Sequence, residues 1–112
     1  MKTINAYVRK EKIDQILTAL VEGGTVQIMV LPGHIAGRAM DQEKAPVRTE
    51  YGRKMQAMVK IECFCRDREE NAVVNTIRRL ACTGRPGDGF ITVSNQNRLV
   101  RIDSGAESGD AL

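Results

Sequence analysis

The sequence lacks tryptophan and contains only two tyrosines, two phenylalanines and a single histidine among its 112 residues. One histidine is too few for a multi-histidine metal site within one chain. No apolar run approaches the roughly 20 residues that a membrane-spanning helix needs. Residues 1–8 have the composition of a strand and lack the apolar centre of a secretion signal. We therefore expect a cytoplasmic protein that does not insert into a membrane.

Cysteine is also scarce, and its odd count of three does not indicate a disulfide framework. Cys63 and Cys65 lie two apart, so on a strand they share one sheet face. Cys82 and His34 could complete a four-ligand zinc set on paper, but nothing in the spacing resembles a zinc knuckle. Buried, inert thiols are the favoured interpretation, and we expect no metal site.

The first half of the chain shows the periods of a strand, a helix and a second strand. Apolar and polar residues alternate over residues 2–9, as in a half-buried strand. Apolar residues within 13–21 fall on one helical stripe, which Gly23-Gly24 ends. The run Thr25 to Leu31 predicts the second strand, ended by Pro32-Gly33.

The second half repeats that order. Residues 55–65 predict a third strand, and Asp67 with Glu70 form an N-cap and capping-box pair for a second helix. Short strands are expected at residues 90–93 and 99–102. The buried stripe of the second helix is expected to consist of Val73, Val74, Ile77 and Leu80.

This order, β-α-β, a long insert and β-α-β, predicts one α+β domain over residues 1–112. Its fold class is ferredoxin-like split βαβ (βαββαβ), with one antiparallel sheet and both helices on one face. The other sheet face is left bare, which oligomerisation would cover. RNA recognition motifs share this order but stack bases on exposed aromatics, and Phe64 and Phe90 are the only phenylalanines. We therefore expect no nucleic-acid binding, and the net charge of +3 is too small to indicate it.

Two loops carry the functional signal. In residues 82–89, three glycines within six residues follow a helix and precede a β-branched run. Such a loop lets backbone N–H groups converge on a phosphate. The insert spanning residues 34–54 is unusually long for so small a domain, and loops of that length are commonly functional. The alternative is a solvated hairpin extension without a task.

These loops on this frame resemble those of the PII signalling proteins, trimeric regulators of nitrogen and carbon metabolism. Thr83-Gly84-Arg85-Pro86-Gly87-Asp88-Gly89 fits the family's T-G-x-x-G-D-G signature, and Val59-Lys60-Ile61-Glu62 matches its third strand. Gly37-Arg38 and Glu50-Tyr51 match the beginning and end of its protruding T-loop, here about residues 36–54. The C-terminal match comprises Val100-Arg101-Ile102 and the tail 103–112.

The resemblance implies a homotrimer in which ATP and ADP compete for clefts between subunits, while the T-loop docks on a transporter, enzyme or regulator. In the glycine-rich B-loop, residues 82–89, it implies that Gly87, Asp88 and Gly89 contact phosphate or ribose. Arg101 would pair with phosphate across the subunit boundary, and Gly37-Arg38 would reach the phosphates from the T-loop. Guanidinium groups suit phosphate because they offer paired donors.

The same resemblance assigns the adenine pocket to Glu62, Cys63 and Phe64 on the third strand. Tyr51 matches a T-loop tyrosine that some bacterial members nucleotidylate, so it is a possible modification site. A tyrosine that packs the base of the loop is the alternative. His34 precedes the loop and is favoured as an ordinary loop residue rather than a ligand contact.

Four departures from the family pattern bear on the ligand. Ala39 replaces a glutamine that helps hold Mg²⁺ and 2-oxoglutarate, and Met58 replaces a lysine that pairs with 2-oxoglutarate. Phe90 and Asp103 replace a further lysine and arginine. Each lost charge-assisted hydrogen bond is worth ~1.5–3 kcal/mol. These changes argue against Mg²⁺ and 2-oxoglutarate as effectors and leave ADP, AMP, ATP or another small anion.

The sequence thus indicates a regulator rather than an enzyme, since it offers no nucleophile–base pair and no catalytic residues. Ligand occupancy would bias the conformation of the T-loop, with Arg38 as the candidate coupling residue. The rival hypothesis is an interaction module that has lost ATP and 2-oxoglutarate sensing. Such a module would bind its partner constitutively or sense another small anion.

Overall fold

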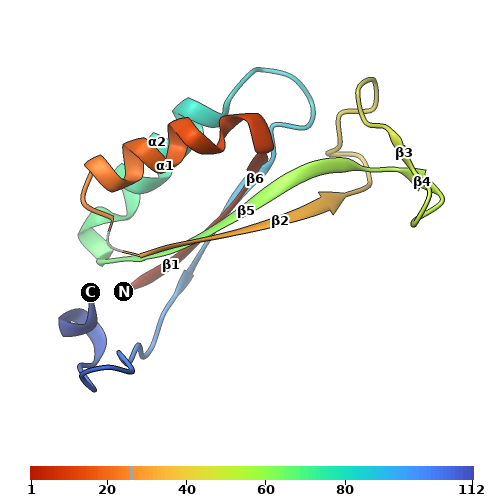
Figure 1. Ribbon diagram of the computed structural model, residues 1–112. Coiled ribbons are helices and arrows are strands. Elements are labelled where there is room, and N and C mark those ends of the chain that lie inside the picture. The colour runs from red at the N-terminus through yellow and green to blue at the C-terminus, as the bar shows by residue number, and fades with distance from the viewer. Residues whose placement is uncertain (26) are drawn as a thin grey trace.

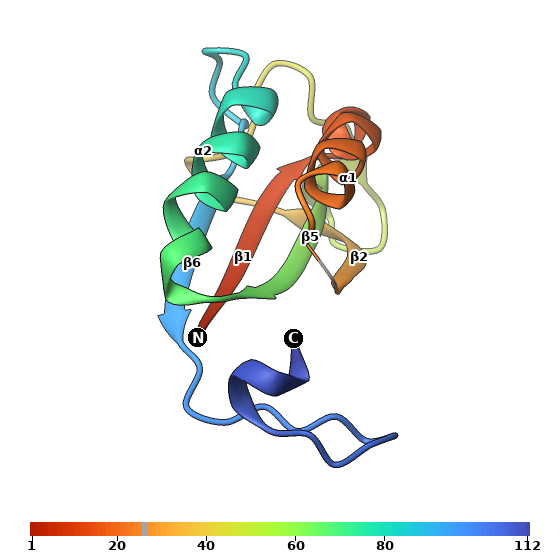
Figure 2. The same ribbon diagram turned by 90° about the vertical axis from the view of Figure 1, so that its left-hand side faces the viewer.

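Strand β1 (Lys2–Arg9) lies inside a four-stranded sheet in the order β2-β5-β1-β6. The computed structural model describes residues 1–25 and 27–112. Neighbouring strands are antiparallel throughout this sheet. Both helices cover one face, as Figures 1 and 2 show, which confirms the ferredoxin-like α+β expectation. The remaining elements of the sheet and its cover are β2 (Ile28–Ile35), β5 (Gln56–Cys65), β6 (Phe90–Asn95), α1 (Ile13–Glu22) and α2 (Glu70–Ala81).

The core forms where the sheet meets the helices. On β1, Ile4, Ala6 and Val8 alternate with polar neighbours and are at most 1% exposed, as a half-buried strand requires. Ile61 lies opposite Ala6 in the β1–β5 register and is fully buried as well. The two helices contribute Ile16, Leu20, Val73, Ile77 and Ala81 to the same cluster.

Strand β2 differs from the sequence expectation, which ended it at Pro32-Gly33. It begins at Ile28 and runs through Pro32 to Ile35, pairing Pro32 with Val59. Because β2 is an edge strand, the missing proline N–H can face away from the sheet at no cost to the ladder. Val26, part of the expected strand, lies outside the described residues.

The capping box before the second helix lies one residue earlier than the predicted Asp67–Glu70 pair, at Arg66 and Glu69. A 3₁₀ turn over Asp67–Glu69 precedes α2. The Glu69 carboxylate accepts the Arg66 N–H at 3.0 Å, so the box closes one residue earlier. Asp67 instead accepts a hydrogen bond from the N-terminal ammonium at 2.7 Å, because β1 begins beside it.

The expected strand at residues 99–102 is wrong. Strand β6 runs antiparallel to β1, and at Asn95 it already lies opposite Lys2, so β1 offers nothing further to pair with. The tail folds back on itself instead: Val100 forms a single bridge with Glu107, and the Ser108 N–H donates to the Leu99 carbonyl at 2.7 Å. Figure 1 shows this C-terminal segment leaving the sheet, in blue.

The face of the sheet away from the helices carries exposed apolar side chains. Met29, Leu31 and Phe90 are 59%, 49% and 50% exposed. Met29 lies opposite Glu62 and Leu31 opposite Lys60 on β5, alternating with the inward-facing core positions. In the described part of the chain, no helix combines the length and apolar character needed to cross a bilayer.

Candidate functional site

The glycine-rich loop, residues 82–89, is closed by the carboxylate of its own Asp88. One carboxylate oxygen accepts the N–H groups of Thr83 at 2.8 Å and Gly84 at 2.9 Å, and the other accepts the Thr83 hydroxyl. Arg9, at the end of β1, donates to the same carboxylate at 3.1 Å. Asp88 therefore holds the loop in shape, with its oxygens already occupied by donors of the chain itself.

These contacts set the acidity of Asp88. Burial raises the pKa of its carboxyl, but the hydrogen bonds from Thr83, Arg9 and Gly84 outweigh burial and lower the pKa from 3.8 to about 2. A carboxyl whose pKa falls on folding stabilises the folded state above its ordinary pKa. That contribution is lost as the pH falls through the folded value.

The substitution Asp88→Asn tests this sign. At pH 7 we expect it to lower the free energy of unfolding by about 2 kcal/mol, because charge-assisted hydrogen bonds are lost. The difference from wild type should shrink between pH 4 and pH 2, since both proteins then lack the charge. Urea unfolding over this pH range is the measurement. A difference that stays constant with pH would contradict this role for Asp88.

The glycines of this loop serve close packing as well as any ligand. Gly89 has φ +97°, and an ideal Cβ there would lie 1.6 Å from the Tyr7 carbonyl oxygen. Gly87 has φ +99°, and its Cβ would lie within 2.9 Å of Asp41 and Gln56 atoms. The sequence suggested phosphate access as the reason for these glycines. The structure adds a second reason, the approach of the loop to β1 and to the long insert.

The long insert contains a short hairpin, β3 (Val47–Arg48) and β4 (Arg53–Lys54), and its base is fixed by Asp41. The Asp41 carboxylate, in a residue only 5% exposed, forms ion pairs with Arg9 at 3.3 Å and with Arg85. Burial raises the pKa of Asp41, but the Lys44 N–H and the two guanidiniums outweigh it and hold the pKa below its usual range. The charged form of Asp41 is thus the stable one.

Gln56 joins the same two loops a second time. Its side-chain oxygen accepts the Asp41 N–H at 2.8 Å, while its side-chain nitrogen donates to the Gly87 carbonyl at 2.9 Å. Arg9 adds a hydrogen bond to the Pro86 carbonyl at 2.9 Å. The insert and the glycine-rich loop are therefore bonded to each other within one chain.

The other candidate residues of the T-loop, Gly37, Arg38 and Tyr51, are exposed to solvent. Gly37 has φ +110°, which suits glycine, and its carbonyl accepts the Met40 N–H at 3.2 Å. Arg38 is exposed and takes part in no ion pair or hydrogen bond within the described residues. Tyr51 is 52% exposed at the hairpin turn, with its ring 5.9 Å from that of His34. Both Arg38 and Tyr51 are accessible.

Arg101 is not brought to the glycine-rich loop within one chain. Its segment lies at the opposite end of the molecule from that loop, as Figure 1 shows. Its guanidinium donates to Asp103 at 2.8 Å, the residue that stands where the family pattern has an arginine. Any joint action of Arg101 and Gly87–Gly89 on one ligand would need a second copy of the chain.

The three residues of β5 that were expected to line the adenine pocket, Glu62, Cys63 and Phe64, do not all face the same side of the sheet. Cys63 is fully buried in the core and lies between Ile4 and Ile28 in the sheet, so its side chain is not available to a ligand. Burial raises the pKa of its thiol to about 11, which makes it inert. Glu62 and Phe64 alternate with it on the other face, partly exposed, and Glu62 pairs with Lys60 at 3.7 Å.

Two of the departures from the family pattern have new partners. The Phe90 ring lies against Tyr7, with centroids 4.7 Å apart, on the bare sheet face. Met58 is 3% exposed beside Gly89. A lysine at either position would place an ammonium where this chain has apolar contact. At these two positions the chain has apolar contacts where the family pattern has lysines.

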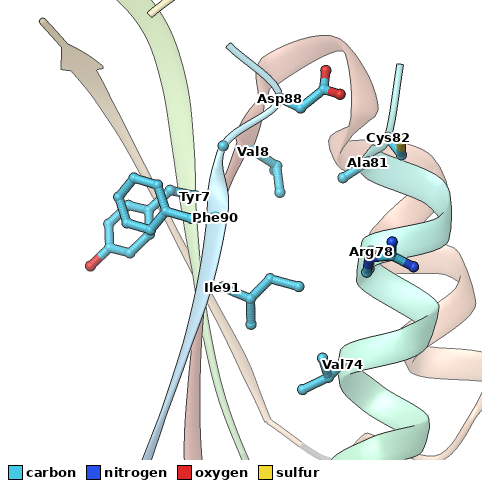
Figure 3. Close-up of a pocket in the computed structure, with 10 residues that line it drawn as sticks. Tyr7, Val8, Val74, Arg78, Ala81, Cys82, Asp88, Phe90 and Ile91 are labelled. Carbon is cyan, nitrogen blue, oxygen red and sulfur yellow. The ribbon is translucent and has the colours of Figure 1, made fainter. Parts of the chain in front are cut away.

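A pocket of about 340 Å³ lies behind the glycine-rich loop, between β6 and α2. Figure 3 shows Ile91 and Val8 on the side of the sheet that faces α2, with Tyr7 and Phe90 on the opposite side. Arg78 on α2 is the cation among its lining residues.

No group of three or more histidine, cysteine or acidic side chains in residues 1–25 and 27–112 is placed to hold a metal ion.

Sequence reasoning missed the residues that connect the two loops. Arg85 was named only as part of the glycine-rich loop signature, and Arg9, Asp41 and Gln56 were given no role. Asp41 lies 32 residues from Arg9 and 44 from Arg85, and nothing in the sequence pairs charges over such separations. Alternation along β1 places Arg9 on the same face as Asn5 and Tyr7, away from the core, so the pattern gives no sign that Arg9 is buried.

No model of a known protein family matches the chain. Curated relatives do match over their whole length. The chain is 36% identical over 112 residues to a protein of Rhizobium meliloti (strain 1021), 34% to one of Azospirillum brasilense and 31% to one of Nostoc punctiforme (strain ATCC 29133 / PCC 73102). Each alignment covers all of both chains, and each relative is named nitrogen regulatory protein P-II. With these matches and this fold, the chain belongs to the P-II family, whose members are signalling proteins and not enzymes.

Proposed function

We propose that the chain is a cytoplasmic nitrogen-regulatory protein that binds an adenine nucleotide in clefts between the subunits of a homotrimer. Nucleotide occupancy changes the conformation of the T-loop, residues 36–54, which contacts a partner protein. The ligand acts through its different affinities for the conformations of this loop. ADP, AMP and ATP are the candidate effectors, without Mg²⁺ or 2-oxoglutarate.

The observation that supports the phosphate site is the set of free amides in the glycine-rich loop. Among the described residues, no hydrogen bond from the N–H groups of Gly87, Asp88 or Gly89 to another group of the chain is found. The hydrogen bonds of the Asp88 carboxylate to Thr83 and Gly84 fix the conformation of the loop. The N–H groups of Gly87, Asp88 and Gly89 are therefore held in place with no acceptor among the described residues. Preorganised N–H groups bind anions without needing a particular side chain.

Isothermal titration with ATP, ADP and AMP tests this proposal. Arg101→Ala should weaken the preferred nucleotide about tenfold, the loss of one charge-assisted hydrogen bond. Arg98→Ala is the matched control, because Arg98 lies three residues before Arg101 and pairs with Glu107. It should leave the affinity unchanged. Wild-type protein that binds none of the three nucleotides would refute the adenine-nucleotide site.

The bare face of the sheet supports the trimer. Its exposed apolar residues Met29, Leu31 and Phe90 would be removed from water if copies of the chain packed there. Arg101, remote from the glycine-rich loop in its own chain, could then reach the loop of a neighbour. Light scattering of the purified protein should give the mass of three chains. A monomer would contradict both the covered face and the shared cleft.

A second candidate is favoured by one contact, the Arg101–Asp103 pair. If this pair persists in the assembly, Arg101 is neutralised and the chain becomes an interaction module that binds its partner constitutively or responds to another small anion. Partner capture on immobilised protein separates the two. Capture that changes with added ADP supports the nucleotide-controlled regulator, and capture indifferent to nucleotide supports the module.

A further inference from the structure

The Asp41 carboxylate occupies a position between two guanidiniums. Arg9 and Arg85 both reach the same carboxylate oxygen, one from the end of β1 and one from the glycine-rich loop. Paired guanidinium donors are also the arrangement with which proteins bind phosphoryl oxygens. An acidic side chain of the long insert therefore fills what is chemically an anion site.

The two cations differ in their freedom to change partner. The Arg9 side chain is 7% exposed and is also bonded to Asp88 and to the Pro86 carbonyl, so three acceptors fix its position. The Arg85 side chain is 43% exposed, and its one ion pair within the described residues is with Asp41. Arg85 lies in the loop that carries the free amides of Gly87–Gly89. It can exchange Asp41 for a ligand anion without breaking other contacts.

We propose that the Asp41 carboxylate is an internal occupant of an anion site formed by Arg9 and Arg85, and that a phosphoryl group binding at the glycine-rich loop displaces it. This proposal rests on the proposed function and names the device that couples ligand to T-loop. Displacement breaks the ion pairs of Asp41. Within the described residues, the insert then stays linked to the loop through the Gln56 side chain, which accepts the Asp41 N–H and donates to the Gly87 carbonyl. In this proposal Asp41, rather than Arg38, is the residue that couples ligand binding to the conformation of the T-loop.

The consequence is competition between the insert and the ligand for one pair of cations. Anion binding releases residues 36–54, and by linkage any partner that holds these residues in the released form raises the affinity for the anion. Removing the charge of Asp41 should imitate the released state without a ligand.

The test compares wild type, Asp41→Asn and Glu50→Gln by titration with ADP and with inorganic pyrophosphate. Both variants remove one negative charge from the insert, but Glu50 pairs with Arg48 and not with the glycine-rich loop. Asp41→Asn should bind both anions about tenfold more tightly than wild type and should speed hydrogen exchange in residues 36–45. Glu50→Gln should match wild type. Arg85→Gln, at a half-exposed position, should weaken the binding of both anions at least tenfold. This variant provides an independent test if Asp41→Asn folds poorly.

The outcomes separate this inference from the proposed function. ADP binding that Asp41→Asn leaves unchanged, or that Arg85→Gln leaves unchanged, overturns the inference while the nucleotide site stands. Tighter pyrophosphate binding by Asp41→Asn with no ADP binding in any variant supports the inference and excludes ADP as the effector. Absence of binding by both anions to wild type and Asp41→Asn overturns the inference, while titration with ATP and AMP decides the adenine-nucleotide proposal separately.

Discussion

Replacing Gly89 by alanine is expected to lower the free energy of unfolding by about 3 kcal/mol or more, enough to threaten folding of a small domain. The added Cβ would lie 1.6 Å from the Tyr7 carbonyl oxygen and 2.8 Å from its carbonyl carbon. Tyr7 pairs with Lys60 on one side and Phe90 on the other, so β1 cannot move aside. The positive φ of Gly89 adds backbone strain.

Gly84→Ala is the matched control in the same loop. Gly84 has φ +82°, yet nothing lies within 4 Å of its ideal Cβ. Only the backbone penalty applies there, about 1 kcal/mol. Urea unfolding of both variants measures the contrast. Equal losses would show that the close approach of the loop to β1 does not determine the need for Gly89.

Replacing Arg9 by methionine is expected to have the second large effect, a loss of about 3 kcal/mol at pH 7. The Arg9 side chain is 7% exposed and links Asp41, Asp88 and the Pro86 carbonyl. Methionine preserves much of the side-chain volume but leaves the buried Asp41 and the partly buried Asp88 without their shared cation. Removing one partner of a buried pair costs more than the pair contributes, because the remaining charge stays desolvated.

The pH dependence identifies the cause of that loss. Without Arg9 the pKa of Asp88 should rise toward its ordinary value. At pH 3 the Asp88 carboxyl of the folded variant should therefore be protonated to a larger extent than that of folded wild type, in which the pKa of Asp88 is about 2. The difference between the two proteins should therefore narrow from pH 7 to pH 3. Arg48→Met, which breaks the exposed pair with Glu50, should cost at most about 0.5 kcal/mol at either pH. A constant loss for the Arg9 variant would indicate packing rather than charge.

Periodicity was sufficient for the frame of this molecule. The strands over residues 2–9 and 55–65 and both helices lie where alternation and the helical stripe predict them, because these elements bury one face each. The errors arose where the position of a segment in the sheet, rather than its own composition, determines its structure. Pro32 is tolerated only because β2 is an edge strand, and residues 99–102 form no strand because β1 has ended. Neither fact can be derived from the local sequence.

The candidate site was predictable only in part. The glycine-rich loop and the long insert are visible as motifs, but the contact between them depends on charges far apart in the chain. Asp41 and Arg85 become partners only after β5 and α2 have brought their loops to the same end of the sheet. The nucleotide roles of Arg38, Arg101 and Glu62 remain predictions, since they concern a ligand and neighbouring chains.

Hydrogen exchange of the wild-type protein with and without saturating ADP tests the central claim most directly, because it reports on both loops in one experiment. The account predicts slower exchange at residues 83–89, where the free amides would gain a phosphate, together with faster exchange at residues 36–45. Protection at residues 83–89 with an unchanged insert, or no change in either segment, would contradict the coupling of the two loops by a bound anion.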